Sequence, residues 1–126
     1  MKSLTLPCAI FLCVLATAAS PRIFKGQIMD SECATNAHSA TRSHTEMAGI
    51  KGNITNRQCT ILCVEQGDSV YMFLDQNGKN AYKLSTPQKD LKQYAGYKVE
   101  IVGELDDQGK RITVSKIKLI GDTDGH

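Results

Sequence analysis

The fold is decided by residues 69–84, which read SVYMFLDQNGKNAYKL. Apolar and aromatic residues dominate both sides of the Asn77-Gly78 pair. An Asn-Gly pair between two such runs is the strongest short-range signal for a β-hairpin. We therefore predict a strand over residues 69–74, a turn over 76–79 and a returning strand over 80–84.

A short helix is predicted between this hairpin and the next strand. Thr86 fits its N-cap and Pro87 its first helical position, where a missing N–H costs nothing. Gly96 is typical of the residue that ends a helix. The expected buried face consists of Leu91, Tyr94 and Ala95.

Two further strands follow the helix. Residues 97–105 alternate between apolar and polar side chains, which predicts a strand with its odd-numbered positions facing inward. The last strand changes parity, and this predicts a β-bulge near residues 115–116. The inward positions are even at first and then odd: Ile112 and Val114, followed by Ile117 and Leu119.

Upstream of the hairpin, a first strand over residues 22–29 is separated from it by a long insert, residues 31–67. The strand would place Phe24, Gly26 and Ile28 on one face. Most of the insert is polar and has no periodicity. A loop of this length inside a compact domain is usually functional or disordered.

The insert ends in a predicted helix. Thr55 and Gln58 have the spacing of a capping box, in which each side chain accepts a hydrogen bond from the other residue's backbone N–H. The helix would run through Gln66, and Gly67 would follow it as the C′ residue. Cys59 and Cys63 are four positions apart and would share one face.

The predicted order is strand, insert with a short helix, two strands, helix and two strands. This is the order of the OB-fold, a five-stranded Greek-key β-barrel with its helix between the third and fourth strands. The alternative is a meander of four or five strands in another closed or half-open barrel. We predict a mainly β, OB-like barrel, in which ligands bind across strands 2 and 3 and the loop between strands 1 and 2.

Residues 1–18 are typical of a cleaved signal peptide. One positive charge, at Lys2, precedes an apolar run over residues 4–15. That run is too short for a bilayer span of about 20 residues. Small residues then permit cleavage between Ala18 and Ala19. We expect an exported protein, periplasmic or secreted, with one domain over residues 19–126 and no membrane span after cleavage.

The number and distribution of charged residues limit the kinds of partner that the chain is expected to bind. The formal net charge is +2, and it falls to +1 without residues 1–18, which contain only Lys2 as a charged side chain. No basic stripe can be placed on one face, so nucleic-acid binding is not expected. No catalytic constellation is visible either. We expect a monomer that binds a small ligand, a metal ion or a cell-envelope partner.

Three cysteines remain in the mature chain, and they leave three interpretations open. Export favours a disulfide, from Cys33 to either Cys59 or Cys63, that ties the insert to its helix. The first hypothesis is therefore an exported binding or structural module with a stapled loop. The second is a metal site for Zn²⁺ or a softer ion such as Cu(I), completed by His38, with His44 as a spare ligand. The third is a thiol redox protein with Cys59 as nucleophile, because it lies in the first turn of its helix.

Several short motifs resemble a family of small exported bacterial proteins that carry a domain of unknown function. Members show Asp-Ser-x-Cys, then a histidine, then a spaced cysteine pair. The matching residues are the stretch 26–33 (GQIMDSEC), His38, Cys59 and Cys63, the stretches 82–84 and 94–96, and the strand that ends at Gly103. The resemblance covers residues 24–120 and implies a bacterial source and an OB-like barrel, but no activity.

Overall fold

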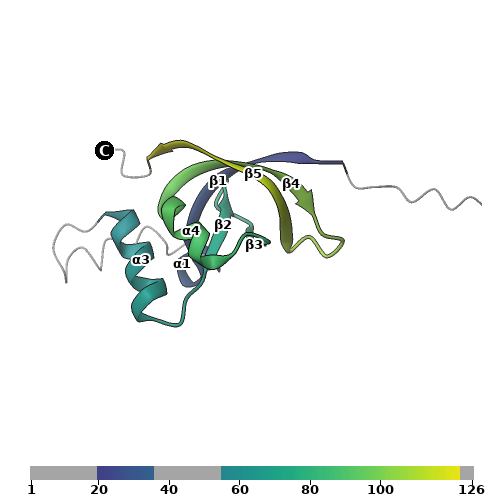
Figure 1. The fold of residues 1–126 in the computed structure, drawn as a ribbon. Coiled ribbons are helices and arrows are strands. Elements are labelled where there is room, and N and C mark those ends of the chain that lie inside the picture. The colour runs from purple at the N-terminus through teal and green to yellow at the C-terminus, as the bar shows by residue number, and fades with distance from the viewer. Residues whose placement is uncertain (1–19, 36–54, 123–126) are drawn as a thin grey trace, which may run out of the picture.

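The computed structural model describes residues 20–35 and 55–122, and within these ranges the chain is mainly β (Figure 1). The strands are β1 (Arg22–Asp30), β2 (Tyr71–Asp75), β3 (Ala81–Leu84), β4 (Tyr97–Leu105) and β5 (Arg111–Asp122). The helices are α1 (Ser31–Thr35), α3 (Asn56–Gln66), α4 (Gln88–Leu91) and the 3-10 helix η1 (Lys92–Tyr94).

The five strands form one mixed sheet that closes on itself. Their order is β1-β2-β3-β5-β4, and β4 pairs with β1 to complete the ring. Only β3 and β5 run parallel, and the other pairs are antiparallel. The predictions of a β-rich chain with five strands, and of a helix between the third and fourth, are confirmed.

The hairpin turn and the inward-facing positions of the strands agree closely with the predictions from the sequence. Gly78 has a φ of 67°, as a turn glycine next to Asn requires. In β4 the odd positions Val99, Ile101 and Gly103 are buried. The bulge predicted in β5 lies at Ser115, because Val102 pairs with Lys116 while its neighbour Gly103 pairs with Val114.

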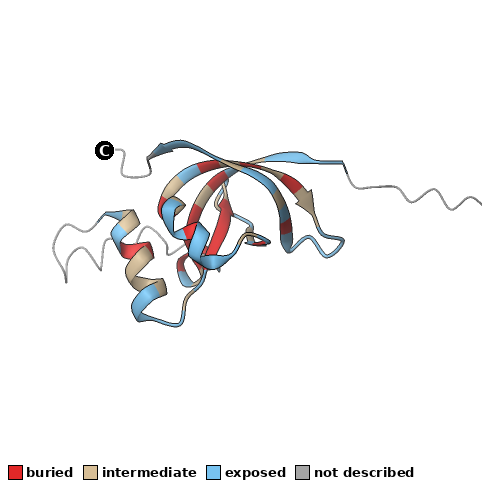
Figure 2. Ribbon diagram, in the orientation of Figure 1, coloured by how far each residue is buried: buried red, intermediate tan, exposed pale blue. Residues whose placement is uncertain are grey.

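The core fills the inside of this ring (Figure 2). It joins residues from every strand and from α4, as expected when each strand turns alternate side chains inward. The largest fully buried side chains in it are Phe73, Ile28, Leu91, Ile101, Ile112 and Val99. The helices α1 and α3 lie together at one end of the ring (Figure 1).

Three local predictions are wrong. Leu119 is 50% exposed instead of inward. Beyond Ile112, β5 no longer pairs with β3, so its far end has only β4 as a strand neighbour. The helix α4 begins one residue late, with Pro87 rather than Thr86 as its N-cap, because Pro87 has an extended ψ of 141°. Finally, α1 lies in a segment for which no helix was expected.

Within the described ranges, no helix is long and apolar enough to cross a membrane. The predicted signal peptide and the cleavage site between Ala18 and Ala19 fall outside these ranges, as do residues 36–54 of the insert. Export therefore stays a prediction.

Hydrogen bonds to two aspartates in turns, Asp75 and Asp106, predict how the free energy of unfolding depends on pH. Asp75 accepts hydrogen bonds from the Lys79 N–H and the Asn80 side chain at 2.9 and 2.8 Å, and Asp106 accepts from the Lys110 N–H at 2.8 Å. Partial burial acts to raise the pKa of Asp75, but these hydrogen bonds outweigh it and lower that pKa. In Asp106 the Lys110 N–H is the main cause of a lowered pKa.

A lowered pKa in the folded state gives stability that is present above the unfolded-state pKa of about 3.9 and is lost as the pH falls through the lower folded-state value. We therefore expect the native chain to be more stable than an Asp75→Asn/Asp106→Asn variant at pH 6, and the difference to shrink below pH 4. Urea midpoints measured at both pH values test this. A difference that stays constant down to pH 2 would contradict it.

Candidate functional site

The end of β1 is shaped by the residues Asp30-Ser31-Glu32-Cys33. Asp30 acts as the N-cap of α1, because its Oδ1 accepts a hydrogen bond from the Cys33 N–H at 3.1 Å. Ser31 fixes the same turn to the chain before β2: its N–H donates to the Val70 oxygen at 2.8 Å, and its Oγ accepts from the Val70 N–H at 3.1 Å. The Asp-Ser-x-Cys sequence therefore holds Cys33 at the end of the closed sheet.

The helix α3 carries the other two cysteines. Its predicted capping box is confirmed: the Thr55 side chain accepts from the Gln58 N–H at 3.1 Å, and Gln58 Oε1 accepts from the Thr55 N–H at 2.9 Å. Cys59 is only 1% exposed, whereas Cys63 is half-buried.

The end of α3 differs from the prediction in one respect. Gly67 follows the helix, but its backbone is extended (φ −118°, ψ −166°) rather than left-handed. A Cβ at this residue would lie 2.6 Å from the Cys63 oxygen. The glycine is therefore needed for close approach and not for a positive φ.

Arg57 anchors α3 to the segment that leads into β4. Its Nη1 donates to three carbonyl oxygens at 3.0–3.2 Å, those of Lys92, Gln93 and Ala95. Its guanidinium carbon lies 4.8 Å from the centre of the Tyr97 ring, within the range of a cation–π contact. An exposed ion pair between Glu65 and Lys92 makes a second link from α3 to η1.

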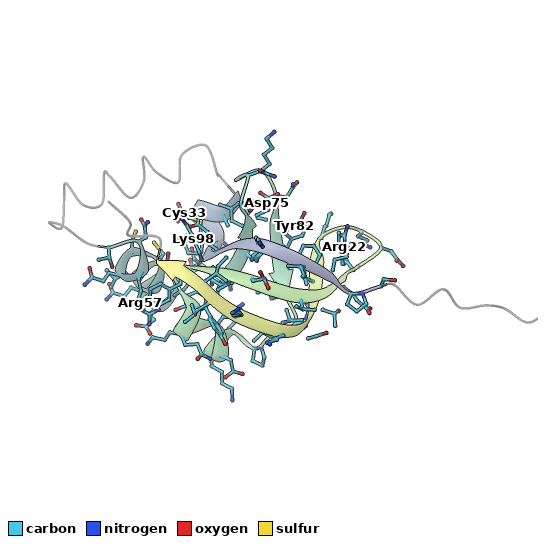
Figure 3. The ribbon with its side chains drawn as sticks, turned by 90° about the horizontal axis from the view of Figure 1, so that it is seen from above. Arg22, Cys33, Arg57, Asp75, Tyr82 and Lys98 are labelled. Atoms are coloured by element: carbon cyan, nitrogen blue, oxygen red, sulfur yellow. The ribbon has the colours of Figure 1, made fainter. Side chains whose placement is uncertain are left out.

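The two helices carry the three cysteines, Cys33 in α1 and Cys59 and Cys63 in α3. The pKa of Cys33 is raised far above its usual range, first by burial, then by the charge of Asp30 and a hydrogen bond with its side chain, and then by the charges of Cys59 and Cys63. The charges of Cys59 and Cys63 thus reach the Cys33 thiol, although they are the smallest of these causes. In Figure 3, Cys33 and Arg57 lie at one end of the molecule, away from Arg22 and Tyr82. We call Cys33, Cys59 and Cys63 the cysteine centre.

The sequence-predicted site residues have different outcomes. The described part of the chain contains no disulfide between the three cysteines, so the bridge stays a prediction. Among the described residues, no group of three or more His, Cys, Asp or Glu side chains is placed so that it could hold a metal ion. His38 and His44 lie outside the described residues. The burial of Cys59 makes it a poor nucleophile for a large substrate, and Cys63 is the more accessible thiol.

Two open cavities lie on the described surface. One, of about 290 Å³, adjoins the cysteine centre and is lined by Glu32, Leu62, Cys63, Gln66, Gly67, Asp68 and Ser69. The other, of about 320 Å³, lies beside β1 and the β2–β3 turn and is lined by Lys25, Gly26, Gln27, Asp75, Gln76, Gly78, Lys98 and Ile120. Of these two, the first is lined by a cysteine and the second is not.

Two residues of this site, Asp30 and Arg57, were not predicted from the sequence. The Asp-Ser-x-Cys spacing was a usable signal for Asp30, because aspartate three residues before a buried cysteine fits an N-cap. No pattern in the neighbouring sequence indicates the role of Arg57, because its partners lie 35 to 38 positions further along the chain.

Comparisons with protein-family models, with curated proteins and with solved structures found no match to this chain.

Proposed function

We propose that this chain is an exported OB-like binding module whose insert is tied to the closed sheet by a disulfide from Cys33 to Cys59 or Cys63. The OB-like assignment is supported by the strand order, by the parallel pair β3 and β5, and by a first strand that pairs with both β2 and β4. A Greek-key barrel of five strands closes in this manner, with a helix between its third and fourth strands.

One observation carries the function: two separate helices of the insert carry the three cysteines, and the charges of Cys59 and Cys63 on α3 reach the Cys33 thiol on α1. In an oxidising compartment, cysteines on neighbouring elements are candidates for a disulfide. A bridge from Cys33 to α3 would close a loop of roughly 25–30 residues and stabilise the fold by about 3 kcal/mol. It would fix the mouth of the cavity beside Cys63, where a small ligand or the surface of an envelope partner could dock.

The test is to count and map thiols in protein exported by a bacterial host. We expect the mature mass to start at Ala19, with one disulfide that includes Cys33 and one remaining thiol. Cys59→Ser and Cys63→Ser variants identify the partner, because only one of them removes the bridge. Three reducible thiols in the exported native protein would overturn the disulfide, and an uncleaved leader would overturn export.

A further inference from the structure

The cavity beside β1 and the β2–β3 turn lies on the outer face of the closed sheet. Its lining shares no residue with the cavity beside Cys63. In β1 the even positions face the core, so Lys25 and Gln27 face outward. Lys98 of β4 is opposite Gln27 in the register, and such neighbours have Cβ atoms about 5 Å apart. The pairing of β1 with β4 therefore places an ammonium group beside a side-chain amide at this cavity.

A β-bulge in β5 gives the same cavity an apolar wall. Ile120 is the extra residue of this bulge, because its two neighbours, Leu119 and Gly121, pair with consecutive residues of β4. Bulges re-aim a side chain, and Ile120 lines the cavity although 47% of the residue is exposed. The stem of Lys98 lies next to the bulge, since its Cδ would be 3.9 Å from a Cβ at Gly121. A positive charge and an apolar surface thus meet at the cavity.

Two hydrogen-bond donors at the cavity have weak partners or none within the described part of the chain. There, no carboxylate lies within ion-pair distance of Lys98, whereas Lys25 lies 4.0 Å from Glu100. The Gln27 side-chain N–H donates to the Met29 sulfur at 3.1 Å, and a thioether is a weak acceptor. An anionic oxygen in the cavity would give both donors a stronger partner.

One carboxylate, that of Asp75, also lines the cavity and limits the charge of a ligand. Its two oxygens accept hydrogen bonds from the Lys79 N–H and the Asn80 side chain, and a carboxyl group in water ionises near pH 4. Asp75 is therefore negatively charged at neutral pH, and it repels a dianion more strongly than a monoanion. A carboxylate suits this cavity better than a phosphate, which reaches a double charge near neutral pH.

We propose that this cavity binds a small organic monocarboxylate, with its carboxylate held by Lys98 Nζ and Gln27 Nε2 and its apolar body against Ile120. The volume of about 320 Å³ is at the lower end of the range for ligand sites, about 300–1,000 Å³. The cavity therefore suits a ligand of the size of butyrate or benzoate and not a polymer. The site is built by β1, β4 and β5, so it does not depend on the proposed disulfide.

The experiment titrates the native chain with sodium benzoate at neutral pH and constant ionic strength, because salt screens exposed charges. Two-dimensional NMR follows the backbone and side-chain amides. We expect saturable shifts centred on Gln27, Lys98 and Ile120, and we expect Lys98→Met to weaken binding fivefold or more. Lys118→Met is the matched control and should bind like the native chain. Lys118 is exposed on the same outer face, opposite Glu100, but does not line the cavity.

Two further comparisons separate the apolar contact from the charge. Ile120→Ser should weaken the binding of benzoate but not that of acetate, and inorganic phosphate should bind more weakly than benzoate. Shifts that do not saturate, native affinity for benzoate in Lys98→Met or in Ile120→Ser, or tighter binding of phosphate through the same amides would each overturn the proposal. If Lys98→Met does not fold, Gln27→Glu decides instead, because a like charge beside the carboxylate must abolish binding.

Discussion

Replacing Gly26 with alanine is expected to lower the free energy of unfolding by about 3 kcal/mol or more, the upper range for overpacking a core. An added Cβ would lie 2.0 Å from the Leu74 oxygen and 2.8 Å from the Phe73 ring. At this residue β1 pairs with β4 through Val99 and with β2 through Asp75. The backbone therefore cannot move away from one neighbour without breaking its pairing with the other.

The measurement is urea unfolding followed by far-UV circular dichroism, since the chain has no tryptophan. Gly78→Ala and Gly109→Ala are matched controls. Both glycines have a φ near +67°, but nothing lies within 4 Å of an added Cβ. Each control should lose only about 1–2 kcal/mol, the usual penalty of a left-handed residue. If Gly26→Ala unfolds at the same urea concentration as these controls, the close approach of β1 and β2 is not a constraint.

The strands could be predicted because their signals are local. Alternation in residues 97–105 gives the inward face of β4, and the parity change in the last strand gives the bulge at Ser115. The capping box at Thr55 is likewise complete within four residues. Such patterns act through neighbouring residues, so they survive in whatever tertiary setting the chain adopts.

The errors lie where distant parts of the chain decide. Leu119 follows the inward parity, yet its exposure depends on where β3 stops pairing with β5. The helix α1 has only five residues, too few for a periodic signal, and it exists because Asp30 caps it and Ser31 joins Val70. Short helices of this kind are stabilised by tertiary contacts and not by propensity.

The candidate site shows the same division. The sequence identified the three cysteines and the helix that carries two of them, but where that helix lies on the sheet depends on how α3 is anchored. That anchor joins Arg57 to residues in and after η1. The buried oxygen of Asp30 is a property of the folded chain alone, because a sequence does not show which polar atoms lose their water.

Arg57→Ala is expected to lower the free energy of unfolding by about 2 kcal/mol, the range for hydrogen bonds with a charged partner. The change removes three hydrogen bonds to carbonyl oxygens and the contact with Tyr97. The packing around Arg57 is tight as well, since a Cβ at Gly96 would lie 2.5 Å from its Cα. Amide hydrogen exchange should therefore accelerate most in α3, which loses its hydrogen bonds to the segment around η1 and its contact with Tyr97 of β4.

Lys92→Ala is the matched control, because it removes the other link from α3 to η1. That link is a solvent-exposed ion pair with Glu65, a type that contributes little to stability. Arg57→Lys separates charge from geometry: an ammonium keeps the charge but cannot reproduce the planar guanidinium over Tyr97. We expect the free energy of unfolding of Arg57→Lys to lie between that of Arg57→Ala and that of the native chain. If the α3 amides stay protected in Arg57→Ala, the helix is held by its buried face, Cys59 and Thr60, and the cysteine centre does not depend on this anchor.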